Sequence, residues 1–258
     1  MRTPQRRGLA LVAWLALLAA GCGDAPQSPS GPRPQSQPTK APAPAYHIDL
    51  PKAEAKPGTA VVILVDTSGS MAQPVPDAKG KQRPKNEIAR DALVGIVGYT
   101  ADWKKGHANA SLQLAIFNFS SRVNPVLPMG DFDADKARAA LGKIPAPNGG
   151  TAIGLAVEEG YKALYRSGCS RKFIVCVTDG ENTSGPGPDI VAPRLHEQTQ
   201  GAVQLNFVAF DTRASQFKFL APINGHVVEA ADGGKLQAEL TTIYEKRILA
   251  EAPDDSGK

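Results

Sequence analysis

The chain has 258 residues, with 29 lysine and arginine residues against 25 aspartate and glutamate residues. Three of the arginines, Arg2, Arg6 and Arg7, stand at the very start, and without them the balance is 26 basic residues to 25 acidic ones. A chain so close to neutral offers no electrostatic basis for binding nucleic acid.

The amino terminus predicts a lipoprotein signal peptide over residues 1–21. The three arginines precede an apolar stretch, Leu9–Ala20, which is too short to cross a bilayer. The sequence Leu18-Ala19-Ala20-Gly21-Cys22 follows, and small residues before a cysteine resemble a bacterial lipoprotein cleavage signal. That resemblance implies cleavage before Cys22 and attachment of lipid, such as palmitate, to this residue. A conventional secretory signal with an incidental cysteine is the alternative.

Residues 22–46 are interpreted as an extended tether. Proline, serine and glutamine dominate this stretch, and it has too few large apolar residues to form a core. Such a segment would hold the following domain away from the membrane. Gly23 and Asp24 form no clear retention signal, which favours the outer membrane of a bacterial cell envelope as the location.

The first strand of the following domain leads into the most informative residues. Ala60–Val65 is an unbroken apolar run rich in β-branched residues, which favours a strand covered on both faces of a parallel sheet. Asp66, Ser68 and Ser70 follow, at the place where open α/β sheets bind ligands. One carboxylate and two hydroxyls are hard oxygen donors, which suit Mg²⁺ or Mn²⁺ better than zinc. An ordinary turn is the alternative.

A long loop, Met71–Lys85, comes next and contains Lys79, Lys81, Arg83 and Lys85. Two interpretations of this loop are open. It would either form a basic rim that steers an acidic partner toward the site, or serve as a solvated connection.

Helix and strand patterns alternate along the rest of the domain. Apolar residues at helical spacing predict helices over residues 86–104, 133–144, 152–166, 189–199 and 234–249. Strands are expected over residues 111–118, 122–128, 171–178, 203–210 and 225–230. Cys169 and Cys176 would lie about 20 Å apart along an extended strand, so we expect no disulfide between them.

Two further segments carry oxygen-bearing residues. Gly149-Gly150-Thr151 opens a predicted helix, with Thr151 as its N-cap. Phe173–Thr178 reads as a second buried strand and is followed by Asp179 and a turn glycine. Three separate loops are therefore expected to deliver carboxyl and hydroxyl oxygens to one rim of one sheet.

Together these residues resemble the von Willebrand factor type A (VWA) family. Asp-x-Ser-x-Ser, Gly-Gly-Thr and Thr-Asp-Gly match its metal-ion-dependent adhesion site in order and in rough spacing. The resemblance covers about Pro57 to Leu249. It implies an α/β fold with a doubly wound, mainly parallel central sheet, helices on both faces and one antiparallel edge strand. We therefore expect a VWA domain over residues 47–250 and a polar tail over residues 251–258.

The resemblance also implies roles for five residues. Ser68, Ser70 and Thr151 would ligate an ion directly, Thr151 when a ligand is bound, and Asp66 and Asp179 would hold it directly or through water. The expected ion is Mg²⁺, with Mn²⁺ or Ca²⁺ as alternatives. Such a ligand set leaves the ion short of one anionic oxygen, which an exposed Asp or Glu of a protein partner can supply.

The expected function is therefore non-catalytic docking of a protein partner by a protein anchored to the membrane through lipid on Cys22. Two alternatives stay open: a metal-dependent hydrolase, and a structural envelope protein with an unoccupied site. Ser68 stands where a haloacid-dehalogenase-type phosphatase needs a second aspartate, no P-loop sequence occurs, and the histidines show no metal-ligand spacing. The sequence does not indicate an oligomeric state.

Overall fold

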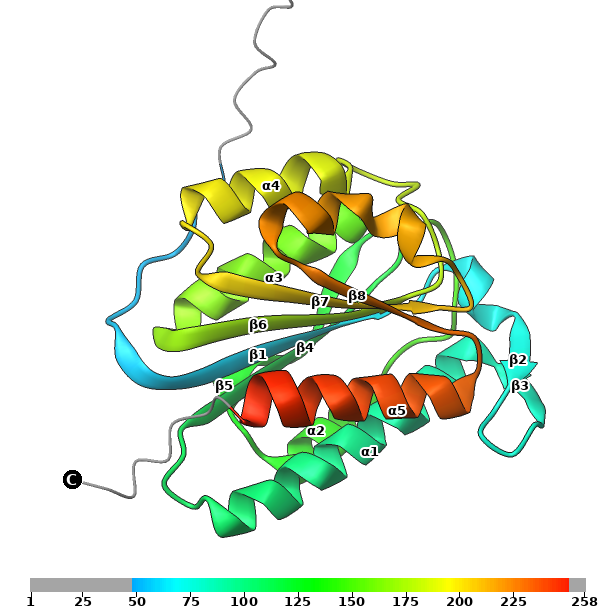
Figure 1. Cartoon of the computed structure of the whole chain (residues 1–258), viewed down its shortest axis with the longest axis horizontal. Coiled ribbons are helices and arrows are strands. Elements are labelled where there is room, and N and C mark those ends of the chain that lie inside the picture. Colours follow the sequence, from blue (N-terminus) through cyan, green and yellow to red (C-terminus); the bar gives the residue numbers. More distant parts are fainter. Residues whose placement is uncertain (1–47, 251–258) are drawn as a thin grey trace, which may run out of the picture. The chain divides into compact units, whose positions relative to one another are not determined.

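A six-stranded sheet forms the centre of the domain in the computed structural model, which describes residues 48–250. The strands are β1 (Lys56–Asp66), β4 (Leu112–Phe119), β5 (Val123–Asp131), β6 (Cys169–Thr178), β7 (Val203–Phe210) and β8 (His226–Ala230). Their order is β5-β4-β1-β6-β7-β8, and only β5 pairs antiparallel to its neighbour (Figure 1). This sheet and its helices confirm the predicted fold class.

Helices cover both faces of the sheet. They are α1 (Lys85–Gly106), α2 (Ala134–Leu141), α3 (Ile153–Ser167), α4 (Pro188–Gln198) and α5 (Gly233–Ile243), with the 3-10 helices η1 (Gly69–Ala72) and η2 (Ala214–Ile223) and the π-helix η3 (Tyr244–Leu249). One face carries α1, α2 and α5, and the other carries α3, α4 and η2 (Figure 1). The predictions for residues 1–47 and 251–258, which include the signal peptide, Cys22 and the tether, lie outside the described residues.

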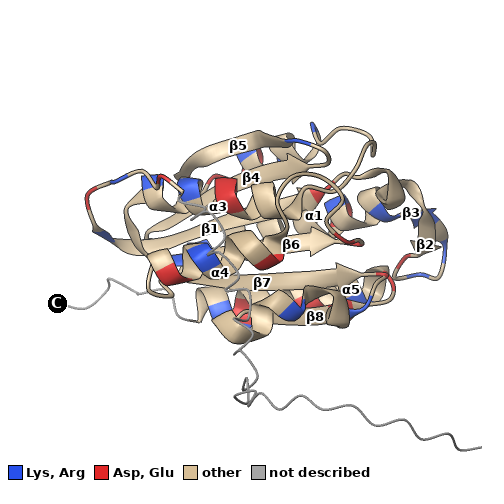
Figure 2. Cartoon of the chain, turned by 90° about the horizontal axis from the view of Figure 1, so that it is seen from above, with Lys and Arg blue, Asp and Glu red and all other residues tan. Residues whose placement is uncertain are grey.

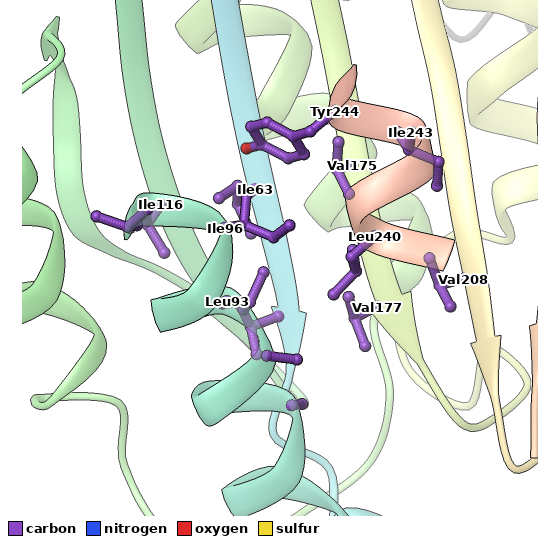
Figure 3. Close-up of a cluster of buried hydrophobic side chains, with 14 of the residues drawn as sticks. Ile63, Leu93, Ile96, Ile116, Val175, Val177, Val208, Leu240, Ile243 and Tyr244 are labelled. Atoms are coloured by element: carbon purple, nitrogen blue, oxygen red, sulfur yellow. The ribbon is translucent and has the colours of Figure 1, made fainter. Parts of the chain in front are cut away.

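The apolar run of β1 is unbroken because both of its faces are buried. Val61, Ile63 and Val65 pack toward α1, α2 and α5, whereas Val62 and Leu64 pack toward α3 and α4. Figure 3 shows part of the first cluster, in which the labelled side chains are Ile63, Leu93, Ile96, Ile116, Val175, Val177, Val208, Leu240, Ile243 and Tyr244. Each large aliphatic side chain buried in this way contributes about 1.5–3 kcal/mol.

The segment expected to be only a loop contains a small hairpin, β2 (Pro74–Pro76) paired with β3 (Gln82–Pro84). Asp77 closes its turn, because its Oδ1 accepts hydrogen bonds from the backbone N–H groups of Lys79, at 2.8 Å, and Lys81, at 2.9 Å. Lysine and arginine residues lie along this hairpin (Figure 2). It stands beside the carboxyl ends of the parallel strands, where the predicted site lies.

The two cysteines of the domain behave as expected. Cys169 and Cys176 both lie in β6, and both are free and buried. Burial raises the pKa of the Cys176 thiol well above its usual value, so this thiol stays protonated and serves as a small core side chain. Within residues 48–250, no helix is long and apolar enough to cross a membrane.

Candidate metal centre

The central strands β1 and β6 bring two of the predicted residues, Asp66 and Asp179, to the same edge of the sheet. These strands are parallel neighbours in register up to the pair Val65 and Val177, so the next residue of each, Asp66 and Thr178, lie together at the carboxyl edge of the sheet. The Thr178 hydroxyl donates a hydrogen bond of 2.6 Å to Oδ2 of Asp66. Asp179 follows directly and therefore enters the same edge.

A chain of short contacts joins the first loop to Asp179. Oδ1 of Asp66 accepts a hydrogen bond of 2.7 Å from the backbone N–H of Ser68. The hydroxyl oxygens of Ser68 and Ser70 lie 3.1 Å apart, and the Ser70 hydroxyl donates a hydrogen bond of 2.8 Å to Oδ1 of Asp179. The structure therefore brings these four predicted residues together.

Backbone contacts hold Thr151 beside this chain. The N–H of Gly69 donates to the carbonyl oxygen of Gly149 at 3.0 Å. Gly149 adopts a left-handed conformation with φ +71°, and a Cβ there would lie only 2.8 Å from the Ser121 hydroxyl oxygen, so a glycine is required. On its other side Thr151 neighbours Gly180, since a Cβ on that glycine would lie 3.9 Å from the Thr151 hydroxyl oxygen.

The predicted N-cap role of Thr151 is wrong. Helix α3 begins one residue later than expected, with Ala152 in the cap position and no capping side chain there. Asn182, in the loop after β6, supplies an acceptor instead, because its Oδ1 takes a hydrogen bond of 3.2 Å from the N–H of Gly154. The Thr151 side chain is thus not engaged in capping α3.

Burial makes Asp66 an unusual carboxyl group. Its side chain is fully buried, and burial raises its pKa to about 6 despite the hydrogen bonds from Thr178 and Ser68, with the nearby Asp179 charge adding to the rise. Both of its oxygens already accept hydrogen bonds from the chain.

A buried lysine completes the cluster, and the sequence did not predict it. The Nζ of Lys85, at the start of α1, lies 2.8 Å from Oδ2 of Asp179 and 3.0 Å from Oδ2 of Asp211. Only 3% of the Lys85 side chain is exposed. Burial lowers the pKa of Lys85, but its hydrogen bonds to the two carboxylates outweigh burial and the pKa is raised.

The interpretation of a basic rim therefore needs correction for two of its four residues. Lys85 is buried in an ion-pair cluster, and Arg83 pairs with Glu87 at 3.2 Å and with Asp91 at 2.9 Å. Of these four basic residues, only Lys79 and Lys81 are exposed.

The donor set fits a small, hard cation. The gathered oxygens belong to two carboxylates and to serine and threonine hydroxyls, which are ligands for Mg²⁺ or Mn²⁺. Among residues 48–250, no group of three or more His, Cys, Asp or Glu side chains is placed to hold a metal. An ion at this edge of the sheet would therefore depend on hydroxyl oxygens.

Comparison with known proteins identifies the family. The model of the von Willebrand factor type A domain matches residues 60–243, which is more than half of the chain. The chain belongs to the VWA family. Among curated proteins no significant match was found.

Solved structures share the fold of this chain. The BatB protein of Bacteroides thetaiotaomicron is 19% identical, with a TM-score of 0.56, and the alignment covers 76% of this chain and all of that one. The PilB minor pilin of Streptococcus sanguinis is 16% identical, with a TM-score of 0.63, over 81% of this chain and 65% of the pilin. A VWA protein of Catenulispora acidiphila is 21% identical, with a TM-score of 0.57, and the alignment covers 74% of this chain and 42% of that protein. Likenesses at these identities show a shared fold.

Proposed function

We propose that this VWA domain docks a protein partner through a divalent cation, with Mg²⁺ as the preferred ion. Ser68, Ser70 and Thr151 would bind the ion, and an exposed Asp or Glu of the partner would complete its coordination. Asp66, whose oxygens both accept hydrogen bonds within the chain, would act through water. Asp179 would offer Oδ1, the oxygen that faces Ser70.

One observation carries this proposal. The Ser68 and Ser70 hydroxyls lie 3.1 Å apart and Ser70 contacts Asp179, so three oxygen donors from two strand ends converge. Within residues 48–250, the hydrogen bonds of these two hydroxyls involve each other and a carboxylate but no histidine that could activate them as nucleophiles. The arrangement supports ion binding and docking more than hydrolysis.

Calorimetric titration of the full chain in detergent with Mg²⁺, Mn²⁺ and Ca²⁺ tests the ion. Ser70→Ala should weaken Mg²⁺ binding about tenfold or more, because it removes one of the few direct ligands. Ser170→Ala is the matched control, since Ser170 lies exposed at the opposite end of β6. Wild-type protein that binds none of the three ions would overturn the proposal and favour a structural protein with an unoccupied site.

Affinity capture from envelope extract tests the partner. We expect a partner that is retained in Mg²⁺, released by EDTA, and absent with Ser70→Ala. Esterase and phosphatase assays of the same preparations address the alternative enzyme. Turnover that EDTA abolishes and Ser170→Ala preserves would replace docking with hydrolysis as the function.

We further propose that lipid on Cys22 anchors the protein at the cell envelope, as the small residues before this cysteine suggest. Labelled palmitate should enter the wild-type chain and not the Cys22→Ser variant. Equal labelling of both chains, or labelling of neither, would contradict the anchor.

A further inference from the structure

The ion-pair cluster around Lys85 has a fixed geometry. The backbone N–H of Lys85 donates a hydrogen bond of 3.0 Å to the carbonyl oxygen of Gln73. The Nζ of Lys85 also lies 3.4 Å from the side-chain oxygen of Gln73. With 3% of the side chain exposed, the ammonium group has little freedom to swing into water. Its positive charge is therefore a permanent part of the site.

The carboxylate of Asp179 serves two neighbours at once. Its Oδ1 accepts a hydrogen bond from Ser70, while its Oδ2 accepts one from Lys85. The Asp179 side chain has no exposed surface, so the carboxylate cannot turn away from either neighbour without disturbing the loop. A cation bound to Oδ1 would share the Asp179 carboxylate with the ammonium group of Lys85. The cation and the ammonium group are both positive, so at this short range they repel each other.

Asp211 offsets this repulsion. It follows β7 at the same edge of the sheet, and its Oδ2 lies 3.0 Å from the Lys85 Nζ. Its N–H donates a hydrogen bond of 2.7 Å to the carbonyl oxygen of Ala230, which anchors its backbone, while 43% of its side chain is exposed. The exposed carboxylate neutralises part of the ammonium charge without being enclosed in the centre.

We propose that Lys85 and Asp211 set the divalent-cation affinity of this site in opposite directions, Lys85 weakening it and Asp211 strengthening it. The inference rests on the proposed metal-dependent function. A site weakened in this way holds its ion best when a partner's carboxylate adds the missing negative charge. Ion and partner would then strengthen each other's binding, because such coupling is reciprocal.

Calorimetric titration of the full chain with Mg²⁺ tests the inference in two single variants, a control variant and a double variant. Lys85→Met should bind Mg²⁺ about tenfold more tightly, because a unit charge is removed near the ion. Asp211→Asn should bind it about fivefold less tightly, because the ammonium charge is left less compensated. Asparagine tolerates the left-handed backbone at this position, where φ is +53°.

Lys172→Met is the matched control for loss of a lysine charge. Lys172 lies near the start of β6, about 20 Å from the site, so solvent ions screen its charge and affinity should change less than about twofold. In the double variant Lys85→Met with Asp211→Asn, loss of Asp211 should cost less than it does alone, because its partner charge is gone.

The outcomes separate this inference from the proposed function. If neither the wild type nor any variant binds Mg²⁺, the metal-dependent function is wrong and the inference is wrong with it. If wild type binds and Lys85→Met binds equally or less tightly, only the inference is overturned. If circular dichroism shows that Lys85→Met does not fold, the Asp211→Asn variant alone tests the inference. An unchanged Mg²⁺ affinity of Asp211→Asn would then overturn it.

Discussion

At the scale of single residues, the candidate site depends on which hydrogen bonds its carboxylate oxygens already accept within the chain. Asp66 is fully buried and its oxygens accept from Ser68 and Thr178, whereas Asp179 divides its oxygens between Ser70 and Lys85. Such buried carboxylates are stable only when hydrogen-bonded or paired with a positive charge.

The pKa of Asp66 predicts how metal-free protein responds to pH. Because its pKa is about 6 in the fold, against 3.8 as its ordinary value, the fold favours the protonated form. The stability this provides is complete below about pH 4 and is lost as pH rises through 6, a change of about 3 kcal/mol by pH 7.

Urea unfolding in EDTA at pH 4, 5, 6 and 7 measures this change. Asp66→Asn cannot titrate, so its free energy of unfolding should gain about 2–2.5 kcal/mol relative to wild type between pH 4 and 7. A difference between the two proteins that stays constant over this range would show that Asp66 keeps an ordinary pKa.

At the scale of elements, the sequence predicted the helices and strands that have a clear apolar pattern within their own residues. The strands β1 and β6 were found because both of their faces are buried, which leaves unbroken apolar runs that end at Asp66 and Thr178. Lys85 was misplaced on an exposed rim because lysine is rarely buried and its partner Asp179 lies 94 residues away. The hairpin of β2 and β3 was missed because each strand has only three residues and half of these six residues are prolines, which are unfavourable in strands.

Helix α3 provides a prediction at this scale. A Cβ on Gly154 would overlap the carbonyl oxygen of Pro186 in the loop after β6, so Gly154→Ala must push that loop away from the helix. We expect a loss of about 1–3 kcal/mol in the free energy of unfolding, the usual cost of overpacking. Thermal and urea unfolding measure it.

Gly106→Ala is the matched control for a helical glycine. It ends α1, and nothing lies within 4 Å of the position of its Cβ. This variant should be neutral or more stable by about 0.5–1 kcal/mol, because alanine favours the helix. Equal effects of the two substitutions would refute the close contact between α3 and the loop.

At the scale of the whole molecule, the sheet serves to hold the site. Apolar clusters pack against both faces of the central strands, one of them drawn in Figure 3, so the strand ends that carry Asp66 and Asp179 are fixed. The fold could be predicted from alternating patterns together with the resemblance to the VWA family, and three loop motifs selected the five candidate site residues. The cluster of Lys85 and Asp211 could not, because it depends on how distant loops meet.

Loss of core packing should therefore weaken stability far more than loss of a surface contact. Ile63→Ala, in the middle of β1, should lower the free energy of unfolding by about 2–5 kcal/mol, since it leaves a cavity under α1 and α5. Ile190→Ala, at a position that is 52% exposed, should cost less than about 1 kcal/mol. Similar losses in both variants would contradict this description of the core.

In the proposed site, three loops at the carboxyl edge of the sheet together hold one cation. Anomalous diffraction from crystals of the protein grown with Mn²⁺ tests it most directly. We predict one manganese peak within bonding distance of the hydroxyl oxygens of Ser68 and Ser70, on the side of the site where Thr151 lies, and a weaker peak or none in Ser70→Ala. Ordered loops without a peak at saturating Mn²⁺, or a peak held by other residues, would rule out a cation site formed by these three loops.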